Sequence, residues 1–200
     1  MKNLSEILSK AKSFIKRYHL YIFKDVALFI LITVVVHFSY RFWAKKMHYW
    51  PIKTTINNLE SNMSKVVYYH SAWFVENVLN IEITRIDQTK TMYFVNNGYI
   101  SVNRGCSGFK PILQFIILMM FFTGSLKNKL WFIPLGVLAV HLTNLFRIIG
   151  LSVVITKWPE YWDFSHDYLF RPFFYVVIFL MWVWWVEKLA YPKKEKKAAN

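Results

Sequence analysis

The sequence predicts an all-α membrane protein with about four transmembrane helices and a small extracytoplasmic α/β insert made of a helix and a β-hairpin. Hydrophobic residues make up 56% of the 200 residues and aromatic residues 20%, which is above the usual content of a soluble domain. Long apolar runs recur along the chain, and short basic clusters lie beside them. Between the first two runs lies a stretch that is polar enough to fold in water.

The first apolar run covers residues 25–44 and predicts transmembrane helix 1. A basic segment, residues 1–24, precedes it. The run is longer than the apolar part of an ordinary signal peptide, and no small-residue cleavage site follows it, so we expect an uncleaved anchor. The basic segment should then remain in the cytoplasm.

Residues 45–104 form the predicted extracytoplasmic insert. Within it, residues 58–80 can form a helix with apolar faces, but charged and amide side chains interrupt them, so this helix should lie at the membrane surface. Residues 81–86 alternate apolar with polar side chains, and residues 91–95 are rich in β-forming types. The Asn-Asn-Gly sequence at 96–98 is a turn signal. We therefore expect a hairpin or a three-stranded sheet.

The predicted core, residues 105–187, holds three further spans. Apolar residues run from 109 to 123, from 130 to 156 and from 173 to 186. A basic loop joins the first two of these runs, and a basic tail, residues 188–200, follows the third. With four spans, the N-terminal segment, the basic loop and the tail are all cytoplasmic, as the positive-inside rule requires.

The same topology brings together two residues that are 60 positions apart in the chain. Cys106 opens the second span, and His166 belongs to a predicted outer loop, residues 157–167, so both fall on the outer side. Cys106 is the only cysteine and cannot form an internal disulfide. A structural cysteine is the commoner case, and a lone loop histidine is usually an exposed polar residue. The small residues around Cys106 nevertheless favour a tight turn that exposes a reactive thiol.

Arg147 is a charged residue in the interior of a predicted membrane span. It lies nine residues before Thr156, hence about 14 Å along a helix from the outer end of the third span. An Arg at that depth costs at least about 2.5 kcal/mol, so it should face a protein interior or a cavity and have a partner. Asn144 shares its helix face, although it can simply bond neighbouring backbone. His141 and His37 also lie in predicted spans. We expect each of them either to pack between helices or to line the cavity.

The net charge of +14 does not indicate a nucleic-acid-binding protein, because much of the basic charge lies in short clusters beside apolar segments. One cysteine offers no zinc-binding cluster, and we expect neither a metal nor a cofactor. The lipid bilayer is the partner that the composition implies, and the oligomeric state stays open.

Three short motifs occur in order at successive spans: Cys-Ser-Gly at 106–108, Asn-Leu-Phe-Arg-Ile at 144–148, and His166. Together they resemble the exosortase/archaeosortase family over about residues 95–186. Members of that family are multi-span, transpeptidase-like enzymes that recognise secreted proteins with a C-terminal signal made of a short motif, a hydrophobic helix and a basic tail. The resemblance implies Cys106 as nucleophile, Arg147 as transition-state stabiliser and His166 as acid/base.

Four neighbouring residues are candidates for substrate binding or support: Asn144, Arg104, Ser107 and Gly108. Arg104 is positioned to favour a thiolate, or simply to lie among lipid headgroups. A backbone N–H near Gly108 could help Arg147 to hold an oxyanion. Asp167 follows His166 where a small residue is more usual in the family.

We therefore expect an integral membrane cysteine protease/transpeptidase that cleaves C-terminal sorting signals of secreted proteins at the outer face of the cytoplasmic membrane, through a Cys thioester. The acceptor, an amine or water, is left open. An intramembrane protease that hydrolyses without transfer would use the same three residues. The alternative from another class is a non-enzymatic assembly factor or small-solute transport component, in which Arg147 and Asn144 bind an anion or hold the bundle together.

Overall fold

The computed structural model describes residues 20–190, with side chains from residue 24. Much of the predicted basic N-terminal segment, 1–24, and most of the basic tail, 188–200, lie outside the described residues. The long helices are α2 (Leu20–Lys45), α3 (Lys53–Asn77), α4 (Phe109–Phe121), α5 (Leu126–Lys157) and α7 (Arg171–Trp184). Three helical stretches are long and apolar enough to cross a membrane: Lys24–Lys45, Leu126–Lys157 and Pro159–Ala190.

The second predicted span is a shorter helix than the others. α4 has 13 residues and at 1.5 Å per residue is roughly 20 Å long, against about 30 Å for the hydrocarbon core of a bilayer. The predicted membrane fold is thus confirmed as three candidate spans and one shorter apolar helix.

Ser125 caps the N-terminus of α5, because its hydroxyl accepts a hydrogen bond from Asn128 N at 3.3 Å.

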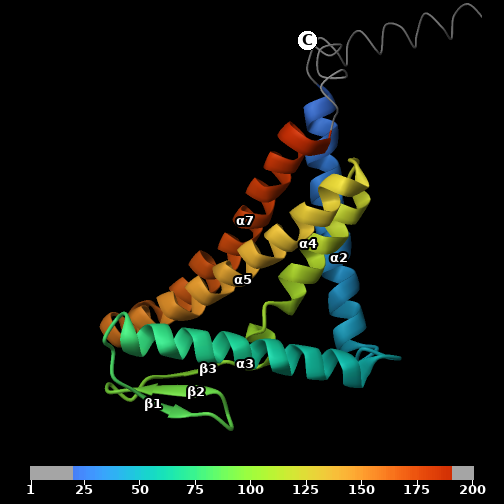
Figure 1. Ribbon diagram of the computed structural model, residues 1–200. Helices are drawn as coiled ribbons and strands as arrows, with labels where there is room; N and C mark the ends of the chain where they lie inside the picture. The colour runs from blue at the N-terminus through green and yellow to red at the C-terminus, as the bar shows by residue number, and fades with distance from the viewer. Residues whose placement is uncertain (1–19, 191–200) are drawn as a thin grey trace, which may run out of the picture.

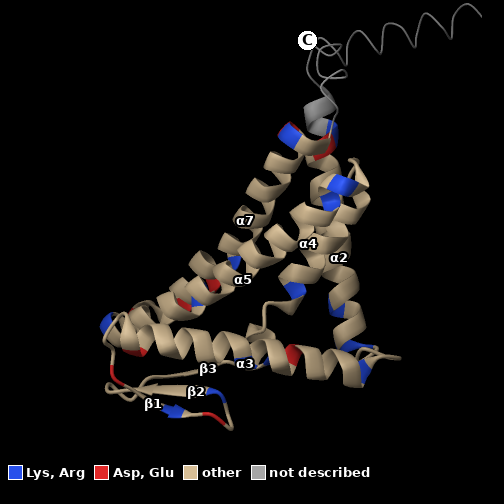
Figure 2. Ribbon diagram, viewed as in Figure 1, with Lys and Arg blue, Asp and Glu red and all other residues tan. Residues whose placement is uncertain are grey.

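The helices converge at one end of the molecule and spread apart at the other (Figure 1). The start of α2, the α4–α5 turn and the end of α7 lie together at the converging end, and α3 runs across the spread end beside the sheet. Two hydrogen bonds hold the converging end: Trp185 Nε1 donates to Thr123 O at 3.0 Å, and Asn128 Nδ2 to Leu189 O at 3.2 Å. The helices between the two ends carry few charges (Figure 2).

The secondary structure predicted between the first two spans is confirmed as a helix followed by a three-stranded antiparallel sheet in the order β1-β2-β3. The strands are β1 (Ile83–Ile86), β2 (Thr91–Phe94) and β3 (Tyr99–Ser101). Met92 pairs with Ile100, and both are buried, whereas the next pair, Tyr93 and Tyr99, is exposed. This alternation turns one face of the sheet toward the protein. Tyr68 of α3 donates to Asp87 Oδ1 at 2.9 Å and helps to fix the sheet to that helix.

Two apolar cores hold the described residues together. The first lies among α2, α4, α5 and α7. The second joins α3 and the sheet to Ile148 and Leu151 of α5, and Cys106 packs at its edge. Asn96, in the β2–β3 turn, donates from Nδ2 to Ile155 O at 2.6 Å and so ties that turn to the end of α5. The second core therefore places the sheet, the cysteine and α5 in contact.

The predicted outer loop at 157–167 is wrong over its second half, because the chain is already helical there. A 3-10 turn at Pro159–Tyr161 leads into α6 (Trp162–Phe164), then a π-helical turn at Ser165–Phe170, and then α7. Pro at the first helical position and acidic residues in the first turn favour helix initiation. His166 thus lies inside the helical run rather than in a loop before it.

Candidate active site

Cys106 closes a short 3-10 turn, Arg104–Cys106, between β3 and α4. The backbone folds tightly there, since Cys106 N donates to Asn103 O at 2.9 Å and Ser107 N to Arg104 O at 3.1 Å. Gly108 then adopts a left-handed conformation, with φ of +78°, directly before α4. This conformation favours glycine. The turn leaves the thiol partly exposed.

Asn144 fixes this turn to α5. Its Nδ2 donates to the backbone oxygen of Cys106 at 2.8 Å, and the side chain is fully buried. A Cβ atom on Gly108 would lie only 3.1 Å from Asn144 Nδ2. Glycine is therefore needed at 108 for the close approach to α5 as well as for the backbone angle.

Arg147 lies about one helical turn beyond Asn144 and reaches the thiol itself. Its Nη2 donates to Cys106 Sγ at 3.5 Å. The guanidinium is partly buried, and its Nε has no hydrogen-bond partner among residues 20–190. The guanidinium of Arg147, which the sequence predicts to lie deep in a membrane span, thus contacts the sulfur of Cys106.

A cavity of about 780 Å³ opens beside this pair. Its walls are the β2–β3 turn, the turn of Cys106, the C-terminal part of α5 and the start of the last helical run. Cys106, Arg147 and His166 all line it. The three residues predicted to form one site therefore meet at one cavity, although they come from three separate elements.

His166 is held in a defined orientation by its neighbours. Its ring stacks on Trp162 at 5.8 Å between centroids, with 10° between the planes. Its Nδ1 lies 2.8 Å from Asp167 Oδ1, and Arg171 Nη1 lies 3.0 Å from the same oxygen. A carboxylate accepts only, so Nδ1 carries the proton and Nε2 is the nitrogen left for the cavity. Within the described part of the chain, His166 and Cys106 share the cavity without a direct hydrogen bond.

The π-helical turn around His166 is itself a feature of functional sites more often than of ordinary helices. Phe170, which ends it, packs on Gly150 so closely that a Cβ atom there would overlap the ring. Glycine on α5 therefore lets the π-turn lie against that helix. Asp167 and Trp162 were not predicted as site residues, and the pattern of His, adjacent Asp and Arg four residues later is the signal that could have identified Asp167.

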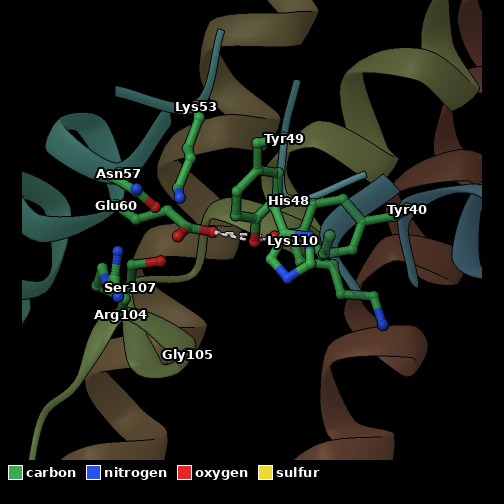
Figure 3. A pocket seen from close by; sticks show the side chains of 11 residues that line it. Tyr40, His48, Tyr49, Lys53, Asn57, Glu60, Arg104, Gly105, Ser107 and Lys110 are labelled. Atoms are coloured by element: carbon green, nitrogen blue, oxygen red, sulfur yellow. Dashed lines mark hydrogen bonds between the residues drawn. The ribbon is translucent and has the colours of Figure 1, made fainter. Parts of the chain in front are cut away.

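Arg104 and Ser107 lie on the other side of the Cys106 turn. Both line a second cavity, of about 460 Å³, and not the one that contains the thiol (Figure 3). Ser107 Oγ accepts a hydrogen bond from Phe109 N at 3.2 Å, which helps to start α4. Among the described residues, no three His, Cys, Asp or Glu side chains are grouped so as to hold a metal ion.

The arrangement suits covalent chemistry at sulfur: a partly exposed thiol, a guanidinium in contact with it, and an oriented imidazole at the same cavity. A family model described as transmembrane exosortase matches residues 27–185, which include all of these groups. No curated protein and no solved structure matches the chain.

Proposed function

The chain belongs to the transmembrane exosortase family, and from this membership we propose that it is a membrane cysteine protease/transpeptidase that cleaves the C-terminal sorting signals of secreted proteins. The observation that carries the proposal is the contact between Arg147 and the Cys106 sulfur at a cavity that His166 also lines. Family membership and the apolar helices make the chain a multi-pass membrane protein.

In the first step, His166 Nε2 takes the proton of the Cys106 thiol, and the resulting thiolate attacks the carbonyl carbon of the substrate. A C–S bond forms, and the carbonyl π electrons move to oxygen. Because Arg147 Nη2 lies 3.5 Å from Sγ, an oxygen on the carbon bonded to that sulfur comes within reach of the guanidinium. Positive charge held there stabilises the developing oxyanion, which is worth about 10²- to 10³-fold for a single donor in comparable sites.

In the second step, the tetrahedral intermediate collapses and the C–N bond breaks. His166 gives a proton from Nε2 to the leaving amine, and a thioester remains on Cys106. An acceptor amine or water then attacks the thioester and loses its proton to His166 Nε2; the C–S bond breaks, and the Cys106 thiolate that leaves takes that proton back. Asp167 on Nδ1 keeps the ring oriented and stabilises the imidazolium form in both steps.

The active cavity is proposed to face outward. Lys127 and Lys129 belong to the first turn of α5, at the converging end of the bundle, and the cavity is built at the spread end with the sheet (Figures 1 and 2). The positive-inside rule favours a cytoplasmic position for the converging end. The sheet, the Cys106 turn and the substrate would then meet outside the membrane.

The test is co-expression with a secreted protein that carries such a signal, followed by immunoblotting and mass measurement of its new C-terminus. Cys106→Ala and Arg147→Ala should abolish processing while the protein still inserts and accumulates, and His166→Ala should reduce it strongly. Full processing by Cys106→Ala would reject the nucleophile. The product mass separates transfer to an amine from hydrolysis.

A membrane-impermeant thiol reagent distinguishes the enzyme from a non-enzymatic assembly or transport protein. If Cys106 is an outward-facing nucleophile, alkylation of intact cells should stop processing. A function that survives complete labelling of Cys106 would favour the non-enzymatic class.

A further inference from the structure

The second cavity lies directly behind the Cys106 turn. It is lined by the end of α2 and the turn that follows it, the start of α3, the turn at Arg104–Ser107, and Lys110 of α4 (Figure 3). The Cys106 turn is thus a wall shared by two cavities. One face carries the thiol, and the other carries Arg104, Gly105 and Ser107.

The floor of this second cavity is a closed network around a buried carboxylate. Glu60 of α3 is 6% exposed, and its Oε1 accepts hydrogen bonds from Tyr40 at 3.0 Å and Tyr49 at 3.2 Å. Burial raises the pKa of the Tyr49 hydroxyl, so it remains a donor at neutral pH. The two hydroxyls lie 3.1 Å apart. The carboxylate is therefore used to tie the end of α2 to α3.

Positive charge dominates the rest of the lining. Lys53, Arg104 and Lys110 line the cavity with Glu60 as the one carboxylate. Lys110 is engaged elsewhere, with its Nζ 3.2 Å from His37 Nδ1 and 5.7 Å from the centre of the Tyr40 ring.

Lys53 and Arg104 are exposed, and within residues 20–190 neither forms an ion pair with Glu60. Both cations, from separate elements, are thus free to bind an anion at this cavity.

The position of the cavity in the fold indicates which class of anion it can bind. The candidate span Lys24–Lys45 ends just before it, and the following turn exposes Met47, Trp50 and Ile52, with Trp50 69% exposed. Aromatic and apolar side chains that are exposed directly beyond a span are typical of the interfacial layer of a bilayer. These exposed side chains favour a position of the cavity mouth at the depth of the lipid headgroups, where phosphate groups are the abundant anions.

We propose that this cavity binds the phosphate group of an anionic phospholipid headgroup. Lys53 and Arg104 supply the charge, and the Asn57 amide and the Ser107 hydroxyl line the same cavity as hydrogen-bond donors. Because Arg104 and Ser107 flank Cys106 in one turn, a bound headgroup would hold that turn from the side opposite the thiol. Binding itself requires nothing of the Cys106 chemistry.

The test uses the full chain, purified in detergent and stripped of lipid, with phosphatidylglycerol as the probe and native mass spectrometry as the readout. The double variant Lys53→Gln/Arg104→Gln should bind the lipid about 30-fold more weakly, since each basic side chain near a lipid surface contributes about fivefold. The matched control Lys127→Gln/Lys157→Gln removes two exposed cations elsewhere and should bind as the wild type does. Lys53→Arg should also retain binding.

Equal affinity of the double variant and the wild type would overturn the proposal, as would an equal loss in the control. If the double variant does not fold, Lys53→Gln alone, which alters one exposed side chain, gives the same test and should bind the lipid about fivefold more weakly. Inorganic phosphate is the second probe: binding of phosphate without the lipid would assign the site to the free ion. An acidic peptide is the third probe. If the double variant no longer binds the peptide but still binds the lipid, the cavity is a site for a protein partner, and the proposal of a lipid site is overturned.

Discussion

Replacement of Asn144 by Ala tests whether the position of the nucleophile depends on its attachment to α5. The change removes the 2.8 Å hydrogen bond to the Cys106 carbonyl and leaves that oxygen without its donor. Loss of one partner of a buried hydrogen bond costs about 1 to 3 kcal/mol. The larger effect should be on geometry, because the turn loses its contact with α5 and the thiol can move away from Arg147. A displacement of about 1 Å at a reacting atom lowers a rate by about 100-fold.

Asn128 offers a matched control on the same helix. Its Nδ2 donates to Leu189 O at 3.2 Å, so Asn128→Ala also removes a bond from an amide to a backbone carbonyl. The two asparagines are 16 residues apart, or about 24 Å along the helix. Both variants should lose stability, but the Cys106 turn is disturbed in Asn144→Ala alone.

The assay is the rate of sorting-signal processing at saturating substrate, with thermal unfolding of each purified variant beside it. We expect processing to fall about 100-fold in Asn144→Ala and less than about threefold in Asn128→Ala. Wild-type processing by Asn144→Ala would refute the view that this bond positions Cys106. An equal loss in both variants would mean that general destabilisation, rather than geometry at the thiol, limits activity.

Three further predictions concern the other parts of the site. Arg147→Gln should lower the processing rate by about 10²- to 10³-fold with little change in the substrate concentration that gives half the maximal rate, because the charge acts on the transition state. Asp167→Asn should lower the rate, since His166 loses the acceptor that sets its tautomer. Gly150→Ala should reduce activity and cost about 1 to 3 kcal/mol of stability, because the added methyl group displaces Phe170 and the π-turn.

Each of these has a control within the chain. Arg147→Lys keeps the charge and should recover part of the rate lost in the Gln variant; a rate as low as that of Gln would point to a need for guanidinium geometry rather than charge alone. Arg171→Gln removes only the second partner of Asp167 and should have the smaller effect. Gly136→Ala crowds Phe115 between α4 and α5, away from the cavity, and should lower stability with less effect on the rate per folded molecule.

The three residues that the sequence singled out line one cavity, whereas the elements that carry them were predicted less accurately. Spans and charge clusters together predicted that Cys106 and His166 lie on one side of the membrane, with Arg147 about 14 Å along its helix from that side. The start of the last helical run was misplaced because Trp162 to Asp167 is polar and aromatic, without an apolar period that would distinguish a helix from a loop. α4 begins at Phe109, where the predicted apolar run begins, and ends at Phe121, two residues before that run does.

The second cavity could not have been predicted in this way. Tyr40, Tyr49 and Glu60 are separated by 9 and 11 positions and meet through side-chain hydrogen bonds across two helices and a turn. Such a network has no sequence period, because it depends on where the turn after α2 directs Tyr49. In the sequence, Glu60 appears only as a charge that interrupts an apolar face.

The active cavity is assembled on one side of α5, and glycine makes each contact possible. Gly98 brings the β2–β3 turn onto Ile155, with a hypothetical Cβ 2.8 Å from that side chain. Gly108 brings the Cys106 turn onto Asn144, and Gly150, on α5 itself, admits the π-turn. Each wall therefore packs closely against α5 at a glycine, and Arg147 projects from the middle of these contacts. α3 also packs against the sheet and the Cys106 turn, but Arg147 belongs to α5, so a change in the tilt of α5 would alter the distances from Arg147 to the thiol and to the imidazole together.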